Sequence, residues 1–258
     1  MTSTSGAEAP PFDDITQDAF LGGRLTVAQP ARGYRAGIDA VLLAASVPAK
    51  PGQSVLELGC GVGVASLCLG ARVSGLELSG LEVQPDYAEL ARRNGLANGM
   101  DLAVHTGDLM AMPAALRQQS FDHVIANPPY YHAPSRTASR DAGRETAHAE
   151  GASLAAWIDA ATRRLRPNGM LSVIQRADRL RDLLAACDDR LGRLILRPIQ
   201  ARQGRPAQLI LLTATKGGRT PLTLRNPLFL HEGDRHESDS ESYTPLIRDV
   251  LRGGLPLI

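Results

Sequence analysis

The stretch "SVLELGCGVGVASLCLGAR", residues 54–72, decides the fold. Its first five residues, "SVLEL", favour a short buried strand, and "VASLCLGAR" at its end favours a helix. Between them stand glycines at alternate positions, Gly59, Gly61 and Gly63. Glycine lets the backbone come close to a ligand at a helix N-terminus, so this stretch predicts a strand, a ligand-binding loop and a helix.

The same alternation continues after residue 72. Further strands are predicted at 79–83, 102–106, 121–126 and 169–175, and helices at 86–98, 154–165 and 180–191. Two late strands, 193–199 and 207–215, are close enough in sequence to form a hairpin. The pattern predicts an α/β fold with a mostly parallel sheet, helices on both faces and one late antiparallel strand.

The residues before this stretch are less regular. Residues 1–12 are small and polar and predict a disordered leader, whereas 22–37 suggest a hairpin and 38–48 a helix that Pro48 ends. We therefore expect a leader at 1–12, a hairpin and helix packed on the core at 13–53, and the main domain at 54–258.

Composition favours a globular cytoplasmic protein. The chain has 258 residues, 43% of them hydrophobic, which is enough for a full core. The N-terminus lacks a basic region followed by an apolar run, and the longest apolar stretch, 40–47, is far shorter than the ~20 residues that span a bilayer. We expect no membrane partner. Cys60, Cys68 and Cys187 form no CxxC pair or metal-spaced cluster, so we expect reduced core cysteines and no metal.

The net charge of +1 hides an uneven distribution. It is −5 for residues 1–129, +6 for 130–205 and 0 for 206–258, and 26 of the 28 basic residues are arginine. Arginine suits bidentate phosphate contacts, so an anionic partner is one interpretation. A genome that favours arginine over lysine is the other.

The glycine spacing distinguishes between nucleotide ligands. The dinucleotide fingerprint G-x-G-x-x-G is not matched: its last position is Val64 if the motif starts at Gly59, and Ser66 if it starts at Gly61. Glu57 followed by the three glycines instead resembles motif I of the class I S-adenosylmethionine-dependent methyltransferases. The resemblance implies their Rossmann-like seven-stranded fold and S-adenosylmethionine as the cofactor.

Two more acidic residues fit this cofactor. Glu82 ends the strand 79–83, where a carboxylate can accept hydrogen bonds from both ribose hydroxyls. Asp108, after the strand 102–106, would take the adenine amino group, and Glu57 would lie near the ammonium end. Glu77 is an alternative ribose ligand if the second strand begins earlier, and a solvated strand end would explain any one of these acids alone. The predicted cofactor site also includes two neighbours, Val83 and Leu109.

The tetrapeptide Asn127-Pro128-Pro129-Tyr130 follows the strand 121–126, at the carboxyl edge where open α/β sheets bind ligands. It resembles motif IV of methyltransferases that act on planar NH2 groups: adenine N6, guanine N2 and the glutamine amide. Such a nitrogen is a poor nucleophile because its lone pair is delocalised. Two acceptors, the Asn127 side-chain oxygen and the Pro128 carbonyl, would favour a pyramidal nitrogen. Pro129 would hold the corner and Tyr130 would stack on a flat base. A plain strand-ending turn is the simpler alternative.

The chain from about Asp18 onward resembles the bacterial tRNA (adenine-N6) methyltransferases that modify the adenosine beside the anticodon of a valine tRNA. The resemblance rests on motif I and on "DAFLGGRLTVAQPARGYRAGIDAVLLAA", "FDHVIANPPYY" and "ESYTPLIRDVL". It implies a tRNA substrate. It also implies that Tyr34 to Asp39 lie near the methionine end of the cofactor or the target base, with Arg35 and Asp39 as candidate ligands. A helix N-cap at Asp39 is an equally good local explanation.

Residues 130–150 combine aromatic, histidine and arginine residues without apolar periodicity. This is expected of a loop that orders on a phosphate backbone, although a solvated surface loop has the same composition. The predicted substrate-binding residues in it are Tyr131, Arg136, Arg140 and Arg144.

Three other functions share some of these features. A release-factor-type glutamine methyltransferase shares NPPY but usually has a helical N-terminal domain, where this chain has hairpin-like patterning. An rRNA guanine-N2 methyltransferase is a further enzyme alternative. A catalytically silent RNA-binding protein of the same fold would predict a broken NPPY or a missing cofactor acid, and both are intact.

Overall fold

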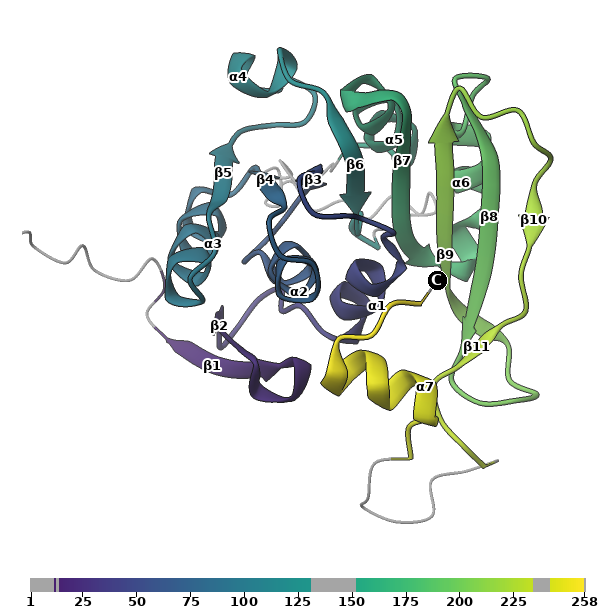
Figure 1. Cartoon of the computed structure of the whole chain (residues 1–258), viewed down its shortest axis with the longest axis horizontal. Coiled ribbons are helices and arrows are strands. Elements are labelled where there is room, and N and C mark those ends of the chain that lie inside the picture. Colours follow the sequence, from purple (N-terminus) through teal and green to yellow (C-terminus); the bar gives the residue numbers. More distant parts are fainter. Residues whose placement is uncertain (1–11, 13, 131–151, 234–241, 258) are drawn as a thin grey trace, which may run out of the picture.

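A mostly parallel sheet lies between two layers of helices in the computed structural model, which describes residues 12, 14–130, 152–233 and 242–257 (Figure 1). The strands of this sheet are β3 (Ser54–Leu58), β4 (Glu77–Glu82), β5 (Leu102–Thr106), β6 (Phe121–Ala126), β7 (Leu165–Arg176), β8 (Leu191–Gln200), β9 (Ala207–Lys216), β10 (Thr223–Leu224) and β11 (Leu228–Phe229). Their order is β10-β8-β9-β7-β6-β3-β4-β5, with β11 also beside β8. Strand β9 is antiparallel to both β7 and β8, whereas the other pairs are parallel.

The sheet confirms the predicted fold class. Its seven longer strands are those expected from the sequence, and the late hairpin β8–β9 supplies the antiparallel strand. The two-residue strands β10 and β11 were not predicted, because two residues carry no periodicity. Strand β4 begins at Glu77, two residues before the predicted start, and ends at Glu82.

Each layer of helices has its own hydrophobic core. The helices are α1 (Ile38–Ser46), α2 (Val64–Arg72), α3 (Pro85–Ala97), α4 (Ala114–Arg117), α5 (Leu154–Arg164), α6 (Leu180–Ala186) and α7 (Pro245–Arg248), which continues into the π-helical turn η3 (Asp249–Gly253). Successive strand residues point to opposite faces, so in β3 Val55 packs with α1, α2 and α3, whereas Leu56 and Leu58 pack with α4, α5 and α6. None of the described helices is long and apolar enough to cross a membrane.

The N-terminal hairpin differs from the predicted one. It pairs β1 (Ile15–Phe20) with β2 (Leu25–Pro30), whereas the sequence had suggested residues 22–37. The reason is that Gly22 and Gly23, both at positive φ, form the turn (η1, Leu21–Gly23) and not the beginning of the first strand. The segment 31–37 then leads without regular structure to α1. The predicted leader lies outside the described residues except for Phe12, whose ring packs edge-on against Tyr87 with centroids 5.1 Å apart.

Two asparagines of α3 hold this hairpin against the main sheet. The Asn94 side chain accepts from the Ala28 N–H at 2.8 Å and donates to the Ala28 carbonyl at 3.0 Å. One turn later Asn98 makes the same pair of bonds with Thr26, at 3.1 and 2.8 Å. The two amides therefore satisfy backbone groups of β2 as a neighbouring strand would. Asn94 also donates to the carbonyl of Val62 in the glycine loop at 3.0 Å, so hairpin, helix and loop are joined.

Candidate active site

A cavity of about 420 Å³ lies where the carboxyl ends of β3, β4 and β6 meet. Its walls come from the segment before α1, the glycine loop after β3, the end of β4, the corner after β6, and α5. This volume lies in the range of small-molecule binding sites. The structure therefore brings the two sequence motifs together at one place.

Two glycines of the loop have no room for a side chain. Gly59 has φ +62°, and a Cβ there would lie 2.5 Å from the ring of Trp157. Gly63 has φ +88° and precedes α2; its Cβ would lie 3.0 Å from Leu102. Both positions combine a left-handed backbone with a close neighbour, so glycine is required at each. The loop runs close beside the cavity, as a cofactor cradle must.

Glu82 ties the glycine loop to the end of β4. Its buried carboxylate accepts from the Gly61 N–H and from the Gln84 N–H, both at 2.9 Å. Each carboxylate oxygen has a second lone pair, so two hydroxyl donors from the cavity could still bind. Glu77 is exposed at the opposite end of β4 and faces away from this edge. The position of Glu82 fits the ribose role, and that of Glu77 does not.

Glu57 lies buried behind the glycine loop. One of its carboxylate oxygens accepts from the Ser66 N–H at 2.9 Å and from the Ser66 hydroxyl at 2.6 Å. It thereby satisfies an otherwise unpaired N–H in the first turn of α2. Burial raises the pKa of Glu57 to about 7, and the hydrogen bonds from Ser66 only partly offset it. This carboxylate holds the loop and contributes a titratable charge beneath it.

Three further predicted cofactor residues follow the ends of β4 and β5: Val83 lines the cavity, whereas Asp108 and Leu109 do not. Val83 lines the cavity with 60% of its surface exposed, although valine side chains are usually buried. Asp108 follows β5, whose last residue pairs with Glu82, and its carboxylate accepts from the Met110 N–H at 2.8 Å. Leu109 packs on the core beneath α4 and α5. Val83 therefore offers an apolar surface beside the cavity, and Asp108 lies exposed at the next strand end.

The NPPY corner leaves one acceptor without a donor. The Asn127 side-chain oxygen is buried and has no hydrogen-bond partner among the described residues. The Pro128 carbonyl accepts from the fully buried Gln175 side chain at 3.2 Å, and its second lone pair remains. Gln175 also accepts from the Arg176 N–H at 2.8 Å, which fixes the orientation of its amide. The corner thus presents two oxygens beside the cavity and is supported from β7.

Two tyrosines enclose this corner. The Tyr130 hydroxyl donates to Asp39 at 2.6 Å, and burial together with this bond raises the pKa of Tyr130. Burial and the nearby Glu57 and Asp39 carboxylates raise the pKa of Tyr34 to about 12. Both hydroxyls are therefore neutral near pH 7. Asp39 is the second residue of α1 and Gly37 is the N-cap, so the N-cap explanation of Asp39 is wrong.

The backbone of Tyr34 is fixed by a third tyrosine. The Tyr87 hydroxyl accepts from the Tyr34 N–H at 3.1 Å and donates to the Tyr34 carbonyl at 3.2 Å. The Tyr34 ring lies beside Gly61, where a Cβ would be 3.5 Å away. The ring of Tyr34 therefore stands between the glycine loop and the NPPY corner.

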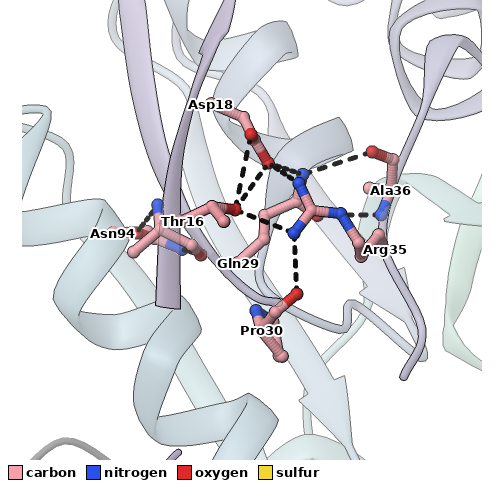
Figure 2. Close-up of polar contacts among 8 residues, drawn as sticks. Thr16, Asp18, Gln29, Pro30, Arg35, Ala36 and Asn94 are labelled. Carbon is pink, nitrogen blue, oxygen red and sulfur yellow. Dashed lines mark hydrogen bonds and ion pairs between the residues drawn. The ribbon is translucent and has the colours of Figure 1, made fainter. Parts of the chain in front are cut away.

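Arg35 is engaged by the hairpin. Figure 2 shows its guanidinium donating to Asp18 at 2.5 Å and to the Thr16 hydroxyl and Pro30 carbonyl, both at 2.8 Å. Gln29 donates to the same Asp18 at 2.7 Å and accepts from the Ala36 N–H at 2.8 Å. All these contacts hold residues 31–37 against the hairpin. The structure thus shows Arg35 bonded to the hairpin and not among the residues that line the cavity, and its cofactor role stays a prediction.

Sequence reasoning missed Trp157, Tyr87 and Gln175. Trp157 is the only tryptophan of the chain and reads as a core residue of an amphipathic helix, because nothing in the pattern of α5 points to the glycine loop. Gln175 is a polar residue inside a buried strand, a signal that could have been used. Tyr131, Arg136, Arg140 and Arg144 lie outside the described residues. No three potential metal ligands lie together in the part of the chain that the structure describes.

Comparisons with known proteins show which family the chain is similar to. The family model "Methyltransferase small domain" matches residues 35–187, which include the glycine loop, Glu82 and the NPPY corner. A tRNA1(Val) (adenine(37)-N6)-methyltransferase of Porphyromonas gingivalis is 33% identical over 178 residues, covering 64% of this chain and 68% of the relative. One of Dickeya chrysanthemi with the same name is 26% identical and covers 86% and 90%. The crystal structure of a predicted O-methyltransferase from Agrobacterium tumefaciens has a TM-score of 0.67 and 30% identity, covering 84% of this chain and 97% of that chain.

Proposed function

The chain belongs to the methyltransferase small domain family, and from this premise we propose that it transfers a methyl group from S-adenosylmethionine to N6 of an adenine in tRNA. The proposed target is the anticodon-loop adenosine of a valine tRNA, the nucleoside named for two of its relatives. We place the reaction in the cytoplasm, where tRNA is modified in bacteria.

The residues of the cavity fit S-adenosylmethionine. The glycine loop provides a close backbone surface, Glu82 provides oxygens for the ribose hydroxyls, and Val83 provides an apolar surface for the adenine ring. Asp108 would accept from the adenine amino group, and Glu57 with Asp39 would favour the positively charged methionine end. Leu109 supports the rim through packing. When bound, this cofactor supplies an electrophilic methyl group.

The unpaired Asn127 oxygen is the observation that carries the proposal. A buried acceptor without a donor costs about 1–3 kcal/mol, which an amino N–H in the cavity would recover. With the Pro128 carbonyl it would hold both N–H groups of a planar amine, so that the lone pair is directed out of the ring plane. As the new N–C bond forms, the S–C bond breaks and the nitrogen loses a proton to solvent. Pro129 fixes the corner, and Tyr130 with Tyr131 would contact the flat base.

Oxygen methylation is a second candidate, since one structural relative is described as a predicted O-methyltransferase. A hydroxyl nucleophile must lose its proton to a base, and the raised pKa values of Tyr34 and Tyr130 keep both of these groups protonated at neutral pH. Two acceptors match the two N–H groups of an amine, whereas a hydroxyl has only one O–H to donate. The site therefore favours nitrogen.

The substrate is tested by labelling. Total RNA and total protein from a strain lacking the gene are incubated with methyl-tritiated S-adenosylmethionine and the purified enzyme. Label in tRNA, recovered as N6-methyladenosine, is the expected result. Label in protein would indicate glutamine methylation, label as N2-methylguanosine in rRNA would indicate the guanine enzyme, and no label in any fraction would leave only the RNA-binding alternative.

The basic loop is part of the proposal. Arg136, Arg140 and Arg144 are proposed to contact tRNA phosphates. Changing all three to glutamine should weaken tRNA binding and flatten its salt dependence. Unchanged affinity at two salt concentrations would refute this role.

A further inference from the structure

A second, smaller cavity of about 230 Å³ lies on the outer half of the sheet. It is bounded by β8, β9, the end of α1 and Leu257, and three arginines line it: Arg193, Arg197 and Arg225. Figure 1 shows α6 behind β8 and β9, whereas no helix of the described part of the chain lies in front of them. This face of the sheet is open and basic. We call it the arginine face, meaning these three arginines with Thr213 and Thr215.

The described part of the chain places no acidic side chain at the arginine face. No carboxylate lines the cavity, and no ion pair involves any of the three arginines within the described residues. The Arg197 guanidinium donates to the Leu257 carbonyl at 2.9 Å, which holds it in place. Burial and the charge of Arg225 both lower the pKa of Arg197, so the two cations face each other. An anion between them would relieve this repulsion.

The backbone directs one of these arginines. Arg193 has φ +51°, in the left-handed region that non-glycine residues rarely adopt, and lies where the β8–β9 register shifts. Such a bulge re-aims a side chain, and a left-handed residue other than glycine costs about 1 kcal/mol or more. A residue without a function here would more simply be glycine. Half-buried Thr213 and Thr215 add hydroxyl donors between the cations.

We propose that the arginine face binds the phosphate backbone of the tRNA substrate outside the anticodon loop. Guanidinium groups bind phosphates through paired hydrogen bonds, and three of them on an open surface suit a polyanion. Strand β8 runs parallel to β7, and Arg193 stands near its start, so the face lies toward the amino edge of the sheet. The candidate active site lies at the carboxyl edge. A tRNA whose anticodon loop enters that site would therefore reach this face only by extending around the outer strands of the sheet. This inference rests on the proposed tRNA substrate.

The test compares two triple variants with the same loss of charge. The first, Arg193→Gln with Arg197→Gln and Arg225→Gln, removes the arginine face. The control, Arg163→Gln with Arg166→Gln and Arg190→Gln, removes arginines that are ion-paired to Asp159, Asp122 and Asp188. Each protein is titrated with the whole tRNA and with its isolated anticodon stem-loop, at two salt concentrations.

We expect the first variant to bind whole tRNA at least tenfold more weakly, with the slope of log affinity against log salt reduced by roughly 2 to 3. The stem-loop should bind both variants and the wild type alike, and the control should retain its affinity for whole tRNA. Equal binding of whole tRNA by the first variant, or an equal loss with the stem-loop, would overturn the proposal.

Two further measurements keep the result interpretable. Thermal unfolding of each variant shows whether the substitutions destabilise the fold. The double variant Arg193→Gln with Arg225→Gln keeps the bond from Arg197 to Leu257, and its affinity for whole tRNA should still fall several-fold. Methylation of the stem-loop by the wild type is scored separately. If the wild type binds tRNA without methylating it, the proposed function is contradicted. The comparison of binding affinities still tests whether the arginine face binds tRNA.

Discussion

At the scale of single residues, Asn127 is the point at which the fold leaves a buried polar atom without a partner. The folded chain provides no donor for this oxygen among the described residues, so a substrate N–H can bind it without breaking a bond of the fold. We expect Asn127→Ala to lower the rate of methyl transfer by at least 10²–10³-fold, the effect of removing one preorganised polar group. Binding of S-adenosylhomocysteine, measured by calorimetry, should change little. An equal loss of binding and transfer would mean that Asn127 belongs to the cofactor site.

Glu57 predicts how stability depends on pH. Burial raises its pKa to about 7, well above the usual value of a glutamate, so between those two values the folded protein keeps a proton that the unfolded chain releases. This contribution to the free energy of unfolding is fully present below the unfolded pKa and is lost as the pH rises through the folded one. The difference corresponds to roughly 3 kcal/mol.

The variant Glu57→Gln keeps an oxygen for Ser66 and cannot ionise. Denaturant unfolding at pH 5 and pH 8 should therefore show a smaller loss of stability with rising pH than in the wild type. The matched control is Glu77→Gln, the same change at an exposed carboxylate of β4. If both variants reproduce the wild-type pH dependence, the carboxylate at 57 is not the titrating group.

Sequence patterns predict a site residue when its place in the fold follows from its neighbours along the chain. Gly59, Glu82 and Asn127 stand at fixed offsets from strands, so the strand ends bring them together around one cavity. Trp157 and Tyr87 reach the cavity from helices, through packing that no local pattern encodes. Arg35 was predicted to lie near the cofactor, and in the structure it forms an ion pair with Asp18. Sequence patterns do not predict this ion pair, because it depends on how the hairpin folds back.

At the scale of elements, helix α3 connects the hairpin to the glycine loop through Asn94. Asn94→Ala would leave the Ala28 N–H and carbonyl and the Val62 carbonyl without their bonds in a buried place. The expected loss is about 2–4 kcal/mol of unfolding free energy, together with weaker binding of S-adenosylhomocysteine because the loop is no longer held. Unfolding in denaturant and calorimetry measure the two effects.

Asn98→Ala is the matched control, since Asn98 makes the same bonds to the same strand one turn later without reaching the loop. It should cost less stability, because its site is less buried, and should leave cofactor binding unchanged. Equal effects on binding from the two variants would contradict the link through Val62.

The long strands and helices were predictable because each buries one face and shows the period of its element. The hairpin was misplaced because Gly22 and Gly23 fit either a strand start or a turn, and only the pairing of Ile15–Phe20 with Leu25–Pro30 decides between them. Strand pairing joins residues that local propensity treats separately. For the same reason β10 and β11 could not be predicted, since they are defined as strands only by their pairing with β8.

At the scale of the whole molecule, the cavity is built from both layers of helices. Tyr34 and the glycine loop belong to the layer of α1 and α2, whereas Trp157 comes from α5 on the opposite face of the sheet. A cofactor in this cavity therefore bridges two separate cores. At a concentration 100 times its Kd, a ligand of the folded state adds about 2.7 kcal/mol to the free energy of unfolding.

Amide hydrogen exchange can locate that effect. We expect S-adenosylhomocysteine to slow exchange in residues 31–37, in the glycine loop and at 82–84, because these segments line the cavity or hold its walls. Exchange in β8 and β9 should be unchanged, since β7 and β6 separate them from β3. In Glu82→Gln the protection of 59–63 should weaken, because Gly61 and Gln84 bind different oxygens of Glu82 and an amide has only one oxygen to accept from them. Protection confined to β8 and β9 would instead place the cofactor in the cavity of the arginine face.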